Sequence, residues 1–264
     1  MKPQTLIFYT LLLAAAHSAH AQRIVVLTPD VADVAAALGA ADQIVARDQT
    51  VQNPALKSKP SIGIYRNLTV EPIIAAKPDL AVGSWMAQPA GIYARLNRAG
   101  VKAVNVAPDD SIAAYPDSIR TLGRLIGKTA QAEKTAAQWQ ADMKQQPANG
   151  RRYLFSYDGR IVAGKNTAAD EIIRRAGGIN AAAAVDGIKP MTREAWLAAK
   201  PDVIVVADHN AKLIGGVKGF AAKPEIAASP AAKNGRIYLW QANDMFRYGL
   251  DTPQIVKKLN ELGR

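Results

Sequence analysis

The chain repeats one order of apolar and helical segments in its two halves, and this duplication limits the folds that are open to it. Each half has a short strand-like run, a helical stretch that ends at Gly, a Lys-Pro-Asp turn that feeds a strand, and a further strand. These segments lie at 23–27, 31–38, 75–82 and 101–106, and again at 152–155, 169–176, 198–206 and 236–239. Apolar strands that alternate with helices predict parallel sheets flanked by helices. We therefore predict an α/β fold with two similar lobes.

The repeat is closest around the two Lys-Pro-Asp units. Glu71 precedes Lys77, and Glu194 precedes Lys200, at the same spacing. Lys-Pro-Asp alone is a common turn from a helix to a strand, because Pro cannot continue a helix. Together with the preceding Glu and the shared order of elements, the two units indicate that the lobes are related.

The segment between the two halves predicts one long helix. Pro116-Asp117-Ser118 offers a helix start, no Pro follows from 119 to 146, and Gly occurs there only at 123 and 127. At ~1.5 Å per residue, a helix over 117–146 would be about 40 Å long, which is enough to span two lobes. We expect a first lobe at 22–115, a rigid linking helix within 116–148, a second lobe at 149–264, and a ligand cleft between the lobes.

The first 21 residues have the three parts of a secretory signal peptide. Lys2 supplies a positive start, residues 6–16 are apolar, and Ala19-His20-Ala21 fits a small-x-small cleavage site. The apolar run is far shorter than the ~20 residues that a membrane span needs. We expect cleavage after Ala21 and a soluble, freely diffusing periplasmic protein. The alternative is a buried N-terminal helix.

The amino-acid composition and the absence of known motifs exclude several kinds of functional site. The chain has no Cys, which excludes disulfides, thiolate metal sites, iron–sulfur clusters and a Cys nucleophile. An enzyme is poorly supported, because the chain has no Gly-x-Ser-x-Gly motif, no phosphate-cradling loop and no His-Glu-x-x-His pair. The formal net charge of +11 favours an anionic partner, but export argues against nucleic acid. His209, the one histidine of the mature chain, is either a surface loop residue or a site residue.

The clearest local cluster is the Gly-Ile-Tyr-Arg-Asn-Leu stretch at 63–68. It has no helical or strand periodicity, and loops often carry sites. Free Tyr titrates near ~10 and is a poor anionic ligand at neutral pH. A nearby guanidinium favours the phenolate, which can bind ferric iron. The alternative is a half-buried Tyr65 beside a solvent-facing Arg66.

The mature chain resembles, over essentially its whole length, the periplasmic haem-binding proteins that serve haem ABC importers. These proteins are part of a wider group of helix-linked periplasmic binding proteins for haem, siderophores and cobalamin. The resemblance runs through residues 23–25, 38–40, 44–48, 163–170 and 249–254, of which the last two are typical of the haem branch.

One departure from the haem branch concerns the iron ligand. Haem members usually carry Gly-Tyr-x-Arg-x-Leu, with that Tyr as axial ligand to iron. In this chain Ile64 stands at that position and Tyr65 follows it, while Arg66 and Leu68 stay in register. A second ligand of some members, a His after the first strand of the second lobe, is replaced by Tyr157-Asp158.

The resemblance implies a monomeric binding protein, not an enzyme, that takes haem as its ligand and delivers it to the permease of an inner-membrane ABC importer. The only metal it implies is the haem iron, with Tyr65 as axial ligand and His209 as the rival. The residues expected to support the propionates are Arg66, Lys165 and Arg247.

The resemblance also assigns a cleft wall and a docking pair. The expected wall residues are Trp85, Met86, Tyr157, Trp240, Met245, Phe246 and Tyr248. Glu71 and Glu194 are expected to dock the permease, one from each lobe. The alternatives are the same fold with a ferric siderophore or a corrinoid, and a haem-handling enzyme or sensor, for which the sequence shows no acid–base group.

Overall fold

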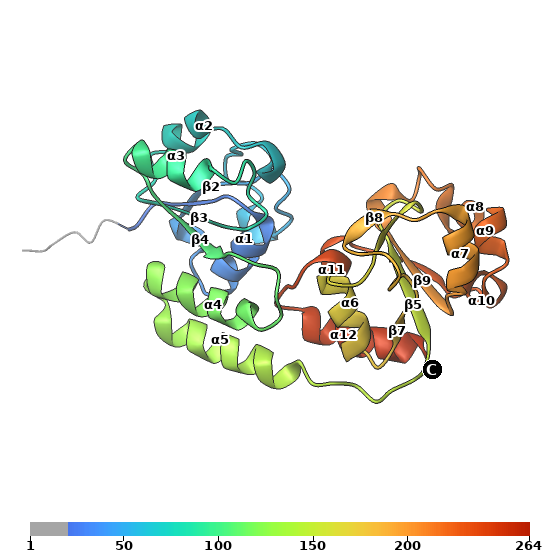
Figure 1. Ribbon diagram of the computed structural model, residues 1–264. Helices are drawn as coiled ribbons and strands as arrows, with labels where there is room; N and C mark the ends of the chain where they lie inside the picture. Colours follow the sequence, from blue (N-terminus) through green and yellow to red (C-terminus); the bar gives the residue numbers. More distant parts are fainter. Residues whose placement is uncertain (1–20) are drawn as a thin grey trace, which may run out of the picture.

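The protein folds into two lobes that lie side by side, with a pair of helices beneath the first (Figure 1). The structure, a computed structural model, describes residues 21–264. The expected signal peptide therefore lies, except for Ala21, outside the described residues. None of the helices in this described part has the length and apolar character that crossing a bilayer requires.

The first lobe is built on a four-stranded parallel sheet with strand order β2-β1-β3-β4. Its elements, with η marking 3₁₀ helices, are β1 (Ile24–Val26), α1 (Pro29–Ala37), η1 (Ala41–Gln43), β2 (Ile44–Arg47), η2 (Pro54–Leu56), η3 (Tyr65–Asn67), α2 (Val70–Ala75), β3 (Leu80–Ser84), α3 (Ile92–Arg98) and β4 (Lys102–Ala107). Figure 1 shows α2 and α3 over one face of the sheet and α1 over the other. Ile24 and Val25 accordingly belong to different core clusters, one on each face.

The second lobe has a sheet of order β10-β9-β5-β6-β8, with β7 beside β5. Its elements are β5 (Arg152–Ser156), β6 (Ile161–Ala163), α6 (Ala168–Arg175), β7 (Ile179–Asn180), β8 (Ile188–Pro190), α7 (Arg193–Ala199), β9 (Val203–Ala207), η4 (Asp208–Asn210), α8 (Gly216–Ala221), α9 (Pro224–Ala227), α10 (Pro230–Lys233), β10 (Ile237–Trp240), α11 (Asn243–Phe246) and α12 (Thr252–Leu262).

The second sheet is mixed, whereas the sequence predicts parallel pairing. β5, β7, β9 and β10 pair in parallel, but β6 is antiparallel to both β5 and β8. The connection at 157–160 is too short for the crossover that parallel strands need, so β6 must return as a hairpin. The two-lobe α/β fold itself is confirmed.

The duplicated order of elements is matched by a duplicated contact. The carboxylate of Asp79 accepts a hydrogen bond from the backbone N–H of Arg23 at 2.8 Å. In the second lobe, Asp202 accepts one from the N–H of Arg152 at 2.9 Å. Each Lys-Pro-Asp unit therefore ties its own strand to the start of the first strand of the same lobe.

The prediction of one helix over 117–146 is wrong. The segment forms two helices, α4 (Ala114–Leu125) and α5 (Thr129–Asp142), which fold back on each other (Figure 1). The chain leaves α4 through Gly127, whose φ of 70° is the left-handed conformation that ends many helices. Gly123 allows the helices to approach closely, because a Cβ there would overlap the Cβ of Ala132.

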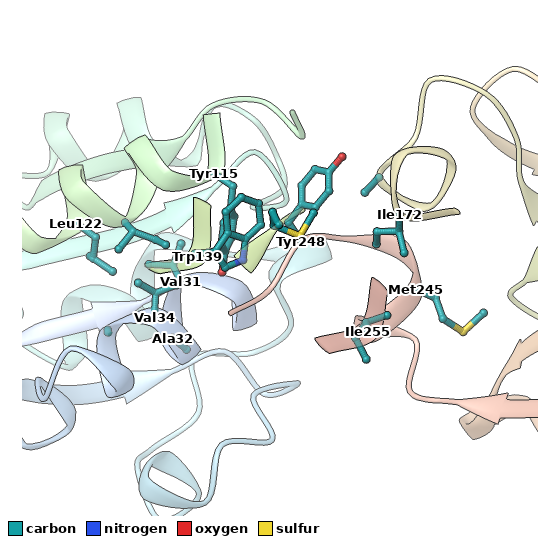
Figure 2. Close-up of a cluster of buried hydrophobic side chains, with 14 of the residues drawn as sticks. Val31, Ala32, Val34, Tyr115, Leu122, Trp139, Ile172, Met245, Tyr248 and Ile255 are labelled. Atoms are coloured by element: carbon teal, nitrogen blue, oxygen red, sulfur yellow. The ribbon is translucent and has the colours of Figure 1, made fainter. Parts of the chain in front are cut away.

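One hydrophobic core continues from the first lobe through the two helices into the second lobe (Figure 2). At its centre the ring of Tyr115 lies 4.8 Å from that of Trp139 and 6.3 Å from that of Tyr248, measured between centroids. These three residues come from α4, from α5 and from the segment that follows α11. The lobes are therefore joined by packing as well as by the chain.

Candidate functional site

Two adjoining cavities of about 310 and 530 Å³ are lined by residues of both lobes. The residues shared by both cavities are Tyr65, Arg66, Tyr157, Ala242 and Asn243. The smaller cavity adds the mostly apolar residues Trp85, Met86, Ile161, Ile188, Phe246 and Arg247. The larger cavity adds the more polar set Pro29, Thr50, Gln52, Ile64, Asp208, His209 and Gln241. The expected cleft between the lobes thus has an apolar end and a polar end.

Tyr65 and Arg66 form the first lobe's side of both cavities. They lie in η3, and the guanidinium carbon of Arg66 is 5.1 Å from the centroid of the Tyr65 ring. Burial raises the pKa of Tyr65 above its ordinary value, and Arg66 only partly offsets this. The effect of Arg66 has the sign that the sequence predicts, but desolvation outweighs it. In the ligand-free protein the phenol is therefore protonated at neutral pH.

Although the tyrosine is offset by one residue from the usual motif position, its side chain lines the cleft. Tyr65 lines both cavities, whereas Ile64 lines the larger one and is 37% exposed. The turn therefore places the Tyr, and not the residue at the usual motif position, between the two cavities.

Tyr157 and His209 form the second lobe's side. Tyr157 follows β5, and its ring lies 5.0 Å from the ring of His209 and 5.9 Å from that of Phe246. The side-chain amide of Asn210 donates to the carbonyl oxygen of Tyr157 at 2.7 Å. His209 is exposed at the edge of the larger cavity, with Nδ1 3.9 Å from a carboxylate oxygen of Asp208.

Arg247 is a buried cation that lines the smaller cavity. Its residue is 7% exposed, and its guanidinium forms an ion pair of 3.4 Å with Asp33 of α1 in the first lobe. Nε donates to Asn243 at 3.2 Å. Arg247 therefore makes a contact between the lobes and also lines the smaller cavity.

Several expected site residues lie elsewhere. Trp240, Met245 and Tyr248 are 7%, 0% and 5% exposed and belong to the interlobe core, so their assignment to the cleft wall is wrong. Their side chains pack in this core and line neither of the two cavities described above. Lys165 is exposed and also lines neither cavity, so the structure does not bring it to the propionate position.

The structure also adds residues that the sequence analysis missed. Ile161 and Ile188 line the smaller cavity from β6 and β8, and Gln241 and Asn243 come from the region after β10. Strands of three residues show too little periodicity to be recognised from the sequence. The polar residues after β10 follow a strand end in an α/β sheet, where ligand sites are common, and that signal could have found them.

Glu71 and Glu194 occupy equivalent places in the two lobes. Each is exposed in the first turn of a short helix, α2 or α7. A backbone N–H of the first turn and the neighbouring Thr69 or Thr192 hydrogen-bond the carboxylate, and these contacts lower the pKa of each Glu. Both side chains are therefore charged at neutral pH.

Residues 24–243 match the model of a family described as periplasmic binding protein. The chain belongs to this family. Family members are binding proteins, so the assignment as a binding protein and not an enzyme is confirmed.

Three proteins with similar structures or sequences show what this periplasmic binding protein resembles. The structure of the periplasmic haem-binding protein RhuT from Roseiflexus sp. RS-1 superimposes with a TM-score of 0.84 at 31% identity, covering 92% of this chain and all of that one (100%). The substrate-binding lipoprotein YvrC of Bacillus subtilis is 28% identical, covering 91% of this chain and 78% of the relative. The vitamin B12-binding protein of Vibrio vulnificus is 24% identical, covering 84% and 82%. The resemblance to periplasmic haem-binding proteins is confirmed at the level of fold and family.

Proposed function

We propose that the protein captures haem in the periplasm and delivers it to an inner-membrane ABC importer. The observation that carries this proposal is the interlobe cleft, where Tyr65 of one lobe and Tyr157 of the other line the same two cavities beside Arg66. An apolar wall with a few polar groups suits a flat macrocycle with charged edges. The similarity to RhuT, which is named a haem-binding protein, supports the same ligand.

In this proposal Tyr65 is the axial ligand to ferric iron. An anionic oxygen donor suits ferric iron better than the thioether of Met86. Arg66, against the Tyr65 ring, favours the tyrosinate once iron displaces the phenolic proton. Arg66 and Arg247 are the cavity-lining cations that would hydrogen-bond the propionates.

A titration of the ligand-free protein with ferric haem tests the ligand. The Soret band is expected to shift, and absorption and resonance Raman spectra should show high-spin tyrosinate ligation. Tyr65→Phe is expected to lose that signature, whereas Tyr157→Phe and His209→Ala should keep it. A wild-type spectrum in Tyr65→Phe together with an altered one in His209→Ala would assign the iron to His209 instead.

We further propose that Glu71 and Glu194 dock basic residues of the permease, one from each lobe. Exposed rim charges guide encounter and register more than they set raw affinity. Changing both to Ala should abolish haem uptake in cells while haem binding to the purified protein is retained. Glu261→Ala, which removes an exposed carboxylate from α12, is the matched control. Normal uptake by the double variant would refute the docking role.

A corrinoid is the second candidate ligand, because one relative is named a vitamin B12-binding protein, and a ferric siderophore is a third. Trp85 is 39% exposed and lines the smaller cavity, so its fluorescence reports occupancy by any of the three. Competition between haem and cyanocobalamin for Trp quenching separates the first two. Quenching by cyanocobalamin at lower concentration than by haem would favour the corrinoid, and quenching by a ferric siderophore alone would favour the third.

A further inference from the structure

A buried carboxylate lies directly behind the Tyr65 turn. Asp48 follows β2 and is fully buried, with 0% exposure. One of its oxygens accepts a hydrogen bond from the backbone N–H of Tyr65. The other accepts from the N–H of Thr50 at 2.7 Å and from the Thr50 hydroxyl. Three donors thus compensate a carboxylate that is removed from water.

Asp48 is itself held against the first sheet. Its backbone N–H donates to the carbonyl oxygen of Val26 in β1 at 3.0 Å, and the N–H of Gln49 donates to the carbonyl oxygen of Gly63 at 2.8 Å. Gly63 has a φ of 95°, which allows the chain to turn towards Asp48 at low steric cost. The carboxylate is therefore a fixed point to which the turn is attached.

The other polar backbone group of Tyr65 is also held. Its carbonyl oxygen accepts from the N–H of Gln88 at 2.7 Å, and the carbonyl oxygen of Gln88 accepts from the N–H of Leu68 at 2.8 Å. With both backbone groups of Tyr65 bound, the direction of its side chain is set. That direction places the ring at the wall shared by the two cavities.

We propose that Asp48 is a positioning residue that makes Tyr65, and not its neighbour Ile64, the residue that faces the ligand. It does so by binding the Tyr65 N–H, which fixes the register of the turn: after a slip by one residue Asp48 would bind the N–H of a neighbour, and Tyr65 would no longer be the residue held there. This inference rests on the proposed function, because it takes Tyr65 to be the group that meets the iron. Asp48 itself touches no ligand and acts only through the turn.

Asp48→Asn tests the inference with little change of shape. An Asn keeps only one acceptor oxygen, and turning that oxygen to the two donors of Thr50 leaves the Tyr65 N–H facing the amide NH2 group without an acceptor. In the ligand-free variant, hydrogen exchange at the Tyr65 amide should accelerate by about tenfold or more. Ferric haem should bind about tenfold or more weakly, with a reduced tyrosinate signature. Asp79→Asn is the matched control, because Asp79 also accepts a backbone N–H in the first lobe, but that of Arg23 and not of Tyr65.

A double variant separates positioning from a general structural role. If Asp48 acts through Tyr65, then Asp48→Asn combined with Tyr65→Phe should bind haem no more weakly than Tyr65→Phe alone. Additive losses would overturn the positioning role. An unchanged exchange rate of the Tyr65 amide in Asp48→Asn would overturn the positioning role of Asp48 but not the assignment of Tyr65 as ligand. A wild-type spectrum in Tyr65→Phe would overturn the ligand assignment, and with it the selection of Tyr65, whatever the exchange rates show.

Discussion

The indole N–H of Trp139 donates a hydrogen bond of 2.9 Å to the carbonyl oxygen of Gly249, which joins α5 to the second lobe. The two residues before Gly249 also make contacts outside the second lobe, through packing and an ion pair. Tyr248 packs on Tyr115 and Trp139, and Arg247 pairs with Asp33. In Figure 1 the segment between α11 and α12 accordingly reaches towards the helix pair. This segment and the continuous core of Figure 2 join the second lobe to the helix pair and to the first lobe.

The first prediction concerns closure of the cleft. Because the interlobe contacts are a packed core and not a flexible hinge, ligand-free and haem-bound forms should superimpose closely, with motion confined to loops. Small-angle X-ray scattering should give the same radius of gyration with and without haem. A large decrease on haem binding would contradict the prediction.

The second prediction concerns Trp139. Trp139→Ala should lower the free energy of unfolding by about 3–5 kcal/mol, because it empties a 4% exposed core position. Trp139→Phe keeps most of the packing but leaves the Gly249 carbonyl without its donor, and should cost about 1 kcal/mol. Urea unfolding of both variants measures the difference. Equal costs would mean that packing contributes little to the interlobe contact.

The third prediction distinguishes the helix pair from one long helix. In a single exposed helix, Gly123→Ala would stabilise by about 1 kcal/mol, because Ala has the higher helix propensity. In the observed pair, the added Cβ overlaps Ala132, so Gly123→Ala should destabilise by about 1–3 kcal/mol. Gly127→Ala, at a φ of 70° with open space around it, should cost about 1 kcal/mol from backbone strain alone. Thermal unfolding of the two variants decides between one long helix and the packed helix pair.

The fourth prediction concerns pH and Asp110, which lies between β4 and α4. Burial raises the pKa of Asp110 from 3.8 to about 7, with Asp30 and Asp109 adding to the shift and Arg247 opposing it. The folded protein therefore binds a proton here that the unfolded chain releases near pH 4. The stabilisation of the folded state by the protonated Asp110 is fully present below about pH 4 and is lost as the pH rises through about 7.

Asp110→Asn should remove this loss of folding stability at higher pH, because Asn does not ionise. The variant should melt at a higher temperature than the wild type at pH 8, by about 2 °C or more, and the gain should shrink at pH 5. Asp117→Asn is the control, because the Asp117 side chain is 77% exposed and its surface ion pair contributes little at either pH. A gain of equal size at both pH values would show that burial of the charge is not the cause.

Local sequence signals predicted the parts of the fold that depend on local chemistry. The paired Glu71 and Glu194, each ahead of a Lys-Pro-Asp unit, revealed the duplication, because capping and turn residues act within a few positions of themselves. The cluster at 63–68 likewise marked a loop that reaches the cleft. The linking segment was misassigned, although Gly127 lies where a C-terminal cap would, because isolated Gly residues are tolerated inside helices.

The sequence by itself therefore determined the two-lobe α/β architecture and the loop that carries Tyr65 and Arg66. Tertiary structure alone decided which side chains face the cleft. Met245 and Tyr248 looked like wall residues but are buried, because the second lobe packs them against α6 and the helix pair. The turn that carries Tyr65 is held by two long-range hydrogen bonds: the Tyr65 N–H donates to the Asp48 carboxylate, and the Tyr65 carbonyl oxygen accepts from the N–H of Gln88. Such contacts join residues far apart in the chain, and no local pattern encodes them.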